Sequence, residues 1–331
     1  MSESHSSSEL NNQEAACGIV FLDKPHGWTS RKAVNEISRL FPSVGKKRAK
    51  AGHAGTLDPL ATGMLPILIG EATRFSGIGL DADKTYRVTL DMSLQTDTLD
   101  GEGEVISRFD ALPDLAAIEA VLPRFNGDIE QQPPAYSAIH VNGKRAHEIM
   151  RQGGEVELAT RRVTIYELQL VNFESPLLSL RVRCSKGTYI RSLARDIGAA
   201  LQAGGCVCEL RRLSTAGWPE VVMADFEQLQ ADPYACLLPL AQWLRHLPSL
   251  ALSQENARRF AHGQRIQLDQ SADSDAEGEV AVFYVVGNAA VTENSMFLGT
   301  ASIKPGMHRM VLHPLRVLPS SLQRLDALDT S

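Results

Sequence analysis

Apolar and polar residues follow strand-like and helix-like patterns along the first two thirds of the chain. Residues 18–25, GIVFLDKP, form a short apolar run that ends at proline, which predicts a buried strand. Residues 30–41 carry apolar side chains at helical spacing, and the Thr-Ser pair at their start can cap a helix. Residues 85–92 and 177–185 alternate apolar and polar positions, so we expect two half-buried strands there.

The later segments continue this mixture of helices and strands. In the second alternating strand, Arg181 and Arg183 fall on one face and the apolar side chains on the other. Residues 190–201 predict an amphipathic helix. Residues 114–134 predict a helix and a Pro-broken turn, and residues 136–156 predict a strand, an Asn-Gly turn and a basic helical stretch. Because no regular βαβ rhythm is present, we expect an α+β fold with a largely antiparallel sheet flanked by helices.

The pattern changes after about residue 247, where short apolar runs are separated by glycine and proline. This texture predicts a small β-rich domain over residues 248–318, after a main domain over residues 17–247. A length of 331 residues suits one large domain and a small one. The polar, Ser-rich residues 1–16 predict a disordered tail, and we expect a second tail over residues 319–331.

The net charge of −6 argues weakly against a nucleic-acid partner. The bases nevertheless cluster, in residues 45–50 and again in residues 181–195. Since local charge decides binding, a basic cleft on an acidic protein and ordinary solvated surface charge are equal alternatives on composition alone.

The cysteines and the hydropathy of the chain indicate the cellular compartment in which the protein is expected. The five cysteines include Cys206 and Cys208, which are one residue apart and therefore unlike a zinc knuckle, so reduced thiols without a metal are the better interpretation. No run of about 18 apolar residues is present. The N-terminus lacks the basic start and apolar run of a secretory signal. We therefore expect a cytoplasmic protein that makes no membrane contact.

The stretch GHAGTLDPLATGML, residues 52–65, holds a single carboxylate, that of Asp58. Pro59 restricts the backbone of Asp58 to extended geometry, and Gly55 and Gly63 let the backbone pass close to a partner. A bare Leu-Asp-Pro is most often an Asx-type turn, in which the carboxylate only satisfies backbone amides. The alternative is a rigidly held acid with a chemical role.

The same stretch resembles the catalytic motif of the bacterial tRNA pseudouridine synthase B family. Further motifs similar to those of that family follow its order along the chain, at residues 18–30, 84–105, 133–148, 184–198 and 210–213. Five motifs in order make the resemblance specific, although each is short. Two residues depart from the family pattern: Ser93 stands near a usual glycine, and His140 stands where lysine is frequent.

The resemblance implies a fold and an activity. It implies a pseudouridine synthase fold with an RNA-gripping insertion at about residues 133–156 and a C-terminal PUA-like RNA-binding domain, best matched by residues 299–318. The activity would be isomerisation of uridine to pseudouridine at position 55 in the tRNA T-loop, by base flipping and with one catalytic Asp. Because nothing is added or removed overall, no cofactor or metal is expected. The implied partner is tRNA, through its T-loop and acceptor arm, and we expect a monomer with no obligatory protein partner.

The resemblance also implies roles for individual residues. Asp58 would act as nucleophile or proton acceptor, Tyr86 would stack on the flipped uracil, and Arg191 would pair with Asp58. It further implies RNA contacts or positions lining the pocket for His53, Tyr189, Leu210 and Lys24. Basic residues that are candidates for contacts to RNA phosphates are Lys144, Arg145, Lys46, Lys47, Arg48 and Arg151.

Two other functions remain as alternatives. The chain would suit a tRNA-binding folding factor whose catalysis is incidental or lost, although a pure binder needs no Asp58, Tyr86 and Arg191 together. A guide-dependent relative shares the catalytic motif but needs partner proteins and carries basic extensions. The compact, acidic chain favours the stand-alone enzyme.

Overall fold

A computed structural model describes residues 16–42, 48–141, 143–268, 277–287, 290–292, 295–307 and 309–328. The expected N-terminal tail, except residue 16, and Asn142 of the expected Asn-Gly turn lie outside the described residues, as do Lys46 and Lys47.

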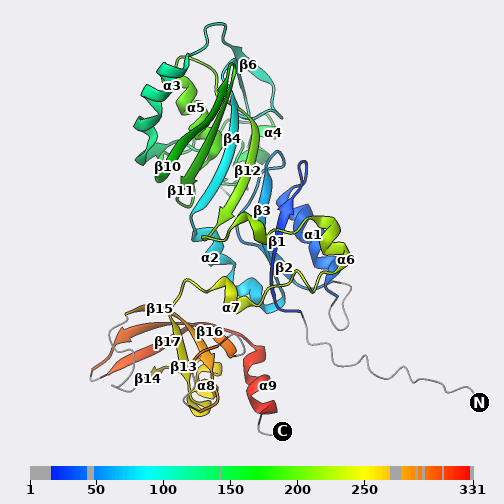
Figure 1. Ribbon diagram of the computed structural model, residues 1–331, viewed down its shortest axis with the longest axis vertical. Coiled ribbons are helices and arrows are strands. Elements are labelled where there is room, and N and C mark those ends of the chain that lie inside the picture. The colour runs from blue at the N-terminus through cyan, green and yellow to red at the C-terminus, as the bar shows by residue number, and fades with distance from the viewer. Residues whose placement is uncertain are drawn as a thin grey trace, which may run out of the picture.

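A large mixed sheet forms the body of the protein (Figure 1). Its strand order is β1 (Gly18–Lys24), β3 (Thr62–Ile69), β12 (Cys206–Thr215), β4 (Lys84–Asp91), β11 (Leu177–Cys184), β10 (Arg161–Glu174) and β7 (Gly127–Gln131), with the short β2 (Ala51–His53) also paired to β3. Only β12 and β3 run parallel; the other pairs are antiparallel. The expected α+β class and largely antiparallel sheet are therefore confirmed.

Helices cover one face of this sheet. The cluster of buried side chains on that face includes apolar residues of α1 (Ser30–Leu40), α3 (Leu115–Val121), α5 (Ile190–Ala200) and α6 (Phe226–Ala231). A second cluster on the opposite face of β1 and β3 includes residues of α7 (Leu240–Trp243) and of the 3₁₀ helix η1 (Gly70–Phe75). The remaining short helices of this part are η2 (Leu122–Phe125), α2 (Ser76–Asp81), α4 (Ala146–Arg151) and η3 (Glu220–Val222).

Segments with one buried face agree with the sequence-based expectations. The strands expected at 18–25, 85–92 and 177–185 and the helices expected at 30–41 and 190–201 are present, with ends that differ by a residue or so. Strands β3, β10 and β12 were not anticipated. The reason is clearest for β3, whose side chains are buried on both sheet faces and so show no alternation.

The C-terminal part forms a separate five-stranded sheet, as the β-rich texture predicts. Its order is β13 (Ser249–Leu252), β15 (Gly278–Tyr284), β16 (Met296–Pro305), β17 (Met310–Val317) and β14 (Ile266–Gln267), and helix α8 (Gln254–Ala261) packs against it. Residues 320–327, expected to belong to a tail, instead form helix α9 (Ser320–Ala327). Leu325 is buried in the core of this sheet, which explains why the short segment is ordered.

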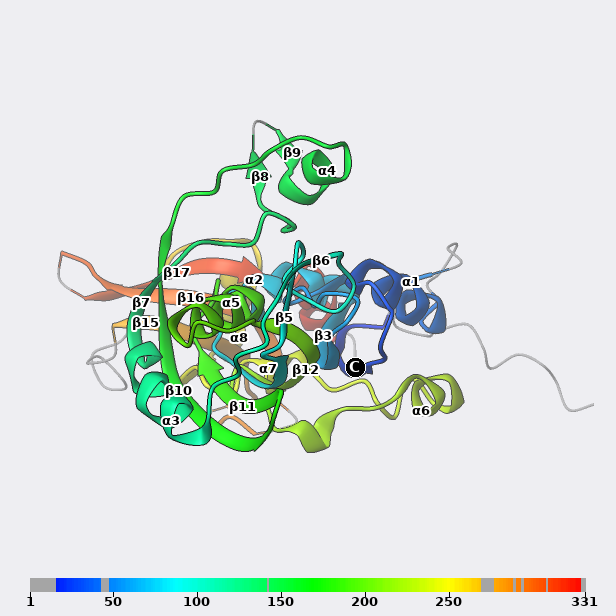
Figure 2. The ribbon, with the colours of Figure 1, turned by 90° about the horizontal axis from the view of Figure 1, so that it is seen from above.

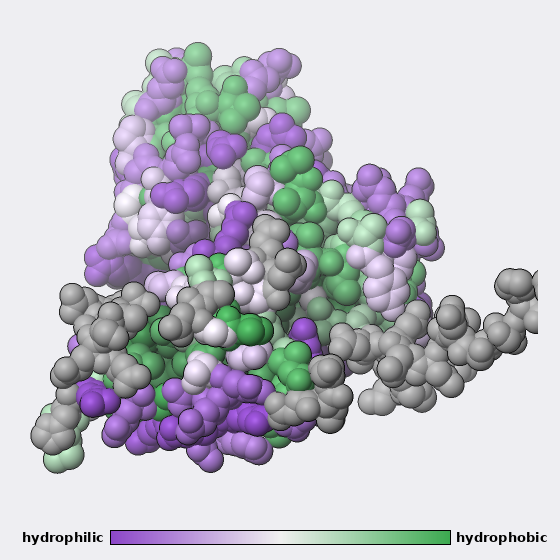
Figure 3. All heavy atoms as spheres, turned by 60° about the horizontal axis from the view of Figure 1, so that its bottom comes forward, coloured by the Kyte–Doolittle hydropathy of each residue, from purple (hydrophilic) through white to green (hydrophobic). Residues whose placement is uncertain are grey.

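Aromatic side chains join the two sheets. Phe297 and Phe283 of the C-terminal sheet contact each other, and Phe297 lies 5.8 Å from the ring of Phe75 in the larger part. Ser320 adds a polar link, since its backbone N–H and hydroxyl both donate to Glu71. Seen from this end, hydrophilic residues gather along the lower edge of the molecule (Figure 3).

No helix within the described ranges is long and apolar enough to cross a membrane.

The aromatic junction generates a stability prediction. Phe297→Ala is expected to lower the free energy of unfolding by about 3–5 kcal/mol, because it leaves a cavity between Phe75 and Phe283. Urea unfolding of the intact chain measures this loss. The control Val286→Ala removes a side chain that is 77% exposed and is expected to change stability by less than about 0.5 kcal/mol. Equal losses for the two variants would contradict a packed junction.

Candidate active site

The loop between β2 and β3 carries Asp58, and donors outside the loop hold its backbone. The hydroxyl of Ser30, at the start of α1, donates to the carbonyl of Leu57 and accepts from the Leu57 N–H, both at 2.8 Å. The carbonyl of Asp58 itself accepts from Ala61 N–H at 3.1 Å. These bonds leave the chain around Asp58 with little freedom to move.

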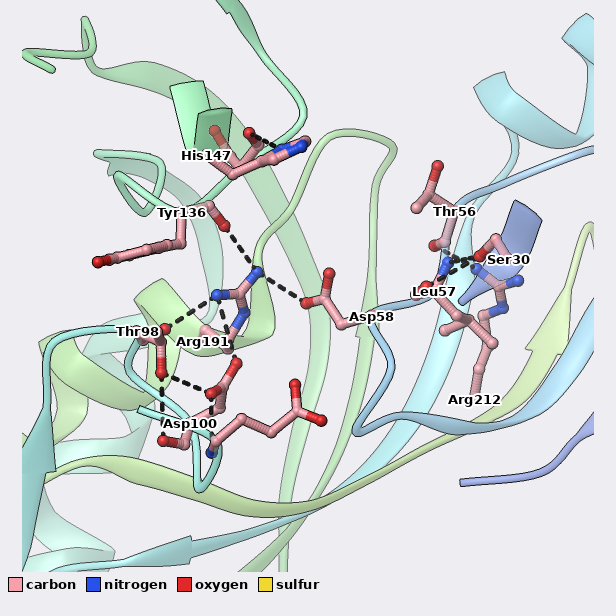
Figure 4. A network of polar contacts seen from close by, with 12 residues as sticks. Ser30, Thr56, Leu57, Asp58, Thr98, Asp100, Tyr136, His147, Arg191 and Arg212 are labelled. Carbon is pink, nitrogen blue, oxygen red and sulfur yellow. Dashed lines mark hydrogen bonds and ion pairs between the residues drawn. The ribbon is translucent and has the colours of Figure 1, made fainter. Parts of the chain in front are cut away.

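A buried arginine holds the first half of this loop. Arg212 of β12 is 1% exposed, and its guanidinium donates to the carbonyls of Gly55 (3.2 Å), Thr56 (3.3 Å) and Met64 (2.6 Å). Figure 4 shows Arg212 beside Thr56. A guanidinium presents several donors in a rigid fork, so it can bind two backbone segments at once. Arg212 therefore joins the loop to β12, a strand paired on both of its edges.

A buried lysine holds the second half. Lys24, at the end of β1, is fully buried and donates to the carbonyls of Pro25 (3.0 Å), Trp28 (2.7 Å) and Pro59 (3.3 Å). Burial lowers the pKa of Lys24 to about 8, against the opposing charge of Asp58, which raises it. At neutral pH the lysine still carries its proton and can donate three hydrogen bonds.

The carboxylate of Asp58 points away from this scaffold and meets Arg191 of α5. Arg191 Nη2 lies 2.8 Å from Asp58 Oδ2, and the arginine side chain is 6% exposed while that of Asp58 is 36% exposed (Figure 4). The acid thus faces solvent on one side and a buried cation on the other. A charge-assisted contact of this length orients the carboxylate.

A second carboxylate, Asp100, completes the surroundings of Arg191. Its Oδ2 lies 3.4 Å from Arg191 Nη1, and the side chain is 5% exposed. Arg191 also donates to the carbonyls of Thr98 (2.9 Å) and Tyr136 (3.1 Å). We did not single out Asp100 in the sequence, although it lies within the motif at residues 84–105. The family motif at residues 84–105 includes a turn at this place, but the approach of Asp100 to Arg191 depends on the positive φ of Leu99 (+64°), which the motif did not predict.

Tyr86 lies beside these groups on β4. It is 8% exposed and stands opposite Arg212 in the pairing of β4 with β12. Burial raises the pKa of Tyr86, and the charge of Asp58 adds to this, while the charge and hydrogen bond of Arg212 oppose it. The phenol therefore keeps its proton at neutral pH.

Family models and curated relatives match most of the chain. Residues 43–190 match a model described as "TruB family pseudouridylate synthase (N terminal domain)", and residues 191–246 match "tRNA pseudouridylate synthase B C-terminal domain". The tRNA pseudouridine synthase B of Chromohalobacter salexigens is 46% identical over 258 residues, which cover 76% of this chain and 82% of that protein. The protein of the same name from Pasteurella multocida is 39% identical over 311 residues, covering 91% of this chain and 95% of that protein.

The chain belongs to the bacterial tRNA pseudouridine synthase B family. The resemblance drawn from the motifs is thereby confirmed, and the chain is a pseudouridine synthase, an isomerase. The fold agrees: a solved structure titled "Crystal Structure of a Cbf5-Nop10-Gar1 Complex" superposes with a TM-score of 0.67 at 23% identity, over 91% of this chain and 84% of that one.

The other residues singled out in the sequence lie at varied distances from this centre. His53, on β2, is partly buried, and burial together with Arg212 lowers its pKa, so its ring is neutral at neutral pH. Leu210 is buried in β12 opposite Val88, within the core. Tyr189 precedes α5, and the guanidinium of Arg161 stacks 4.6 Å from its ring centre.

The basic candidates Lys144 and Arg145 are exposed and lie on an arm. The arm comprises β8 (His140–Val141), β9 (Lys144–Arg145) and α4, and it projects from the body of the protein (Figure 2). Arg48 and Arg151 are exposed as well.

Metal-binding arrangements are absent from the described residues, where no group of three or more His, Cys, Asp or Glu side chains could hold an ion. All five cysteines are free.

The buried lysine generates a prediction. Lys24→Met is expected to lower the free energy of unfolding by about 2–3 kcal/mol, because the carbonyls of Pro25 and Trp28 lose their charged donor inside the protein. Urea unfolding at pH 7 measures this. Lys32→Met is the matched control: Lys32 is exposed and its Nζ lies 4.7 Å from the ring centre of Trp28, so a loss below about 1 kcal/mol is expected. A loss for Lys24→Met no greater than that of the control would contradict the structural role.

Proposed function

We propose that the chain isomerises uridine to pseudouridine at position 55 in the T-loop of tRNA, with the carboxylate of Asp58 as the single catalytic group and without a cofactor. One observation carries this proposal: a solvent-facing carboxylate, held by a buried arginine, extends from a loop whose carbonyls from Gly55 to Pro59 all accept hydrogen bonds. The curated relatives carry the name tRNA pseudouridine synthase B, which supports tRNA as the substrate.

A single carboxylate is sufficient for this chemistry. The reaction breaks the bond from N1 of uracil to C1′ of ribose, turns the base, and joins its C5 to C1′. Asp58 would act as nucleophile or as proton acceptor, and the contact with Arg191 would aim it at the nucleotide. The electron pair of the broken bond leaves with the base, C5 supplies the pair for the new bond to C1′, and the proton lost from C5 is balanced by one gained at N1, so no redox partner is required.

Base flipping would bring the uridine to Asp58, because a stacked base is unreachable. We propose that the flipped uracil stacks on the ring of Tyr86. His53 would fill the space that the base vacates; its neutral ring suits packing against bases better than a phosphate contact. Tyr189 and Leu210 would line the pocket, and Lys24 would act through the loop that it holds.

The arm and the C-terminal sheet would grip the rest of the tRNA. Lys144 and Arg145 are exposed cations on the arm, suited to phosphate contacts that position RNA without reading its sequence. We propose that the C-terminal sheet is a PUA-like unit that contacts the acceptor arm. Because Asp58, Tyr86 and Arg191 come from one chain, the enzyme would act as a monomer without an obligatory protein partner.

The catalytic assignment predicts a complete loss of turnover in Asp58→Asn. Wild type is expected to release tritium from an unmodified tRNA transcript labelled at uracil C5, with the product mapped to the T-loop by carbodiimide-primer extension. The variant is expected to slow this release by at least about 10⁴-fold, because the amide is neither nucleophile nor base at neutral pH. Asp23→Asn is the matched control, since Asp23 is another acid paired with an arginine, Arg211. It is expected to retain activity.

Three other outcomes of this experiment would each contradict a separate part of the proposal. Tritium release by Asp58→Asn at the wild-type rate would remove the catalytic role of Asp58. No release by wild type, with tRNA still bound, would leave an RNA-binding folding factor in place of an isomerase acting on this substrate. Release that maps outside the T-loop would refute position 55.

The arm generates a second functional prediction. The double variant Lys144→Ala/Arg145→Ala is expected to weaken tRNA binding and to reduce the slope of log Kd against log salt by about 1–2, because up to two phosphate contacts are lost. Binding titrations at several salt concentrations measure the slope. The control Arg39→Ala/Arg162→Ala removes two exposed arginines that already pair with acids, and it is expected to keep the wild-type slope. Equal slopes for both double variants would show that Lys144 and Arg145 make no phosphate contact.

A further inference from the structure

Arg212 is a buried cation for which the proposed chemistry gives no direct role. Its guanidinium has no acidic partner among the ion pairs of the described residues, and its side chain is 1% exposed. Removing a charged guanidinium from water without a carboxylate is costly, and burial accordingly lowers the pKa of Arg212. An apolar side chain would fill the same place at lower cost. The contacts that Arg212 makes must therefore offset this penalty.

These contacts join two parts of the active site. On one side the guanidinium binds the carbonyls of Gly55 and Thr56, directly before Asp58. On the other side Tyr86 stands directly opposite Arg212 on the neighbouring strand, where the charge of Arg212 opposes the rise in the pKa of the phenol. Arg191, by contrast, binds the Asp58 side chain.

The loop is shaped to accept Arg212 at close range. Gly55 has a φ of +138°, which disfavours other residues, and a Cβ added there would lie 3.3 Å from Arg212 Nη1. Neighbouring Arg211 points to the other side of the strand, where it binds Asp23 and Glu220. Only one of the two consecutive arginines therefore reaches the loop.

We propose that Arg212 is a positioning residue that sets the distance between the Tyr86 hydroxyl and the loop bearing Asp58. The inference rests on the proposed function, because the uracil has to lie between these two groups. A single planar, rigid cation that donates to the loop carbonyls and lies opposite Tyr86 on the neighbouring strand holds the gap at one width. The arm and the C-terminal sheet would grip tRNA elsewhere, so the loss of Arg212 affects the chemical step rather than affinity.

The test compares variants of the two adjacent arginines. Single-turnover isomerisation is measured with enzyme in saturating excess over tritiated tRNA, and the tRNA Kd is measured separately. Rates are normalised to the fraction of protein that binds tRNA, and thermal unfolding is recorded for every variant. Arg212→Met is expected to slow the rate at least 100-fold with a Kd within threefold of wild type. Arg212→Lys keeps the positive charge but lacks the planar set of guanidinium donors, so its rate is expected to stay at least 10-fold below that of wild type.

Arg211→Met is the matched control. It removes a neighbouring arginine with three ionic hydrogen bonds but no contact to the loop, so the rate per binding-competent molecule is expected to stay within threefold of wild type. A normal rate in Arg212→Met, or in Arg212→Lys where the Met variant does not fold, would overturn the proposal. Equal rate losses for Arg211→Met and Arg212→Met, in step with lost stability, would also overturn it by showing a merely structural role. Absence of isomerisation by wild type would instead refute the proposed function.

Discussion

The active site depends on one buried guanidinium held between two carboxylates. Arg191 lies 2.8 Å from Asp58 and 3.4 Å from Asp100, and it comes from a helix while each acid comes from a different loop. Burying a lone cation is unfavourable, and burying it between two acids with further carbonyl acceptors is what makes the arrangement stable. Because each group needs the others, three distant segments of the chain are fixed relative to one another. Asp58 has a defined direction for this reason, although it lies on a loop.

The loop itself is held by the hydrophobic body of the protein through a few polar side chains. Ser30, Lys24 and Arg212 extend from α1, β1 and β12, whose apolar neighbours form the core. Backbone carbonyls that would otherwise face water are thereby bonded to groups that cannot move without disturbing packed strands and helices. Rigid elements therefore supply the donors, and the loop supplies only the carboxylate that we propose as catalytic.

The sequence predicted those parts of the fold in which one face is buried and the other is polar. The strand at 85–92 and the helix at 190–201 follow simple periodicities, and both are present. The sequence pattern did not predict strand β12, because this strand places the charged side chain of Arg212 in the protein interior, where charged residues are rare. Asp100 was missed for a different reason: its role arises from a long-range approach to Arg191, and no local pattern encodes a contact across ninety residues of chain. The resemblance to a family predicted the contact between Asp58 and Arg191 that the structure contains, whereas periodicity alone left Asp58 as an ordinary turn.

Arg191 also links the acid to the arm. Its Nη2 contacts Asp58 and donates to the carbonyl of Tyr136, which lies at the root of the arm, and the neighbouring Ser192 hydroxyl donates to the carbonyl of Gln132 in the same root. A displacement of the arm that lengthens the 3.1 Å bond to Tyr136 therefore changes the hydrogen bonding of the nitrogen that orients Asp58. Under the proposed function, the arm binds RNA and Asp58 acts on it. RNA gripping and alignment of the acid are then linked through this one nitrogen atom, while Asp100 and the carbonyl of Thr98 hold the other end of the same guanidinium.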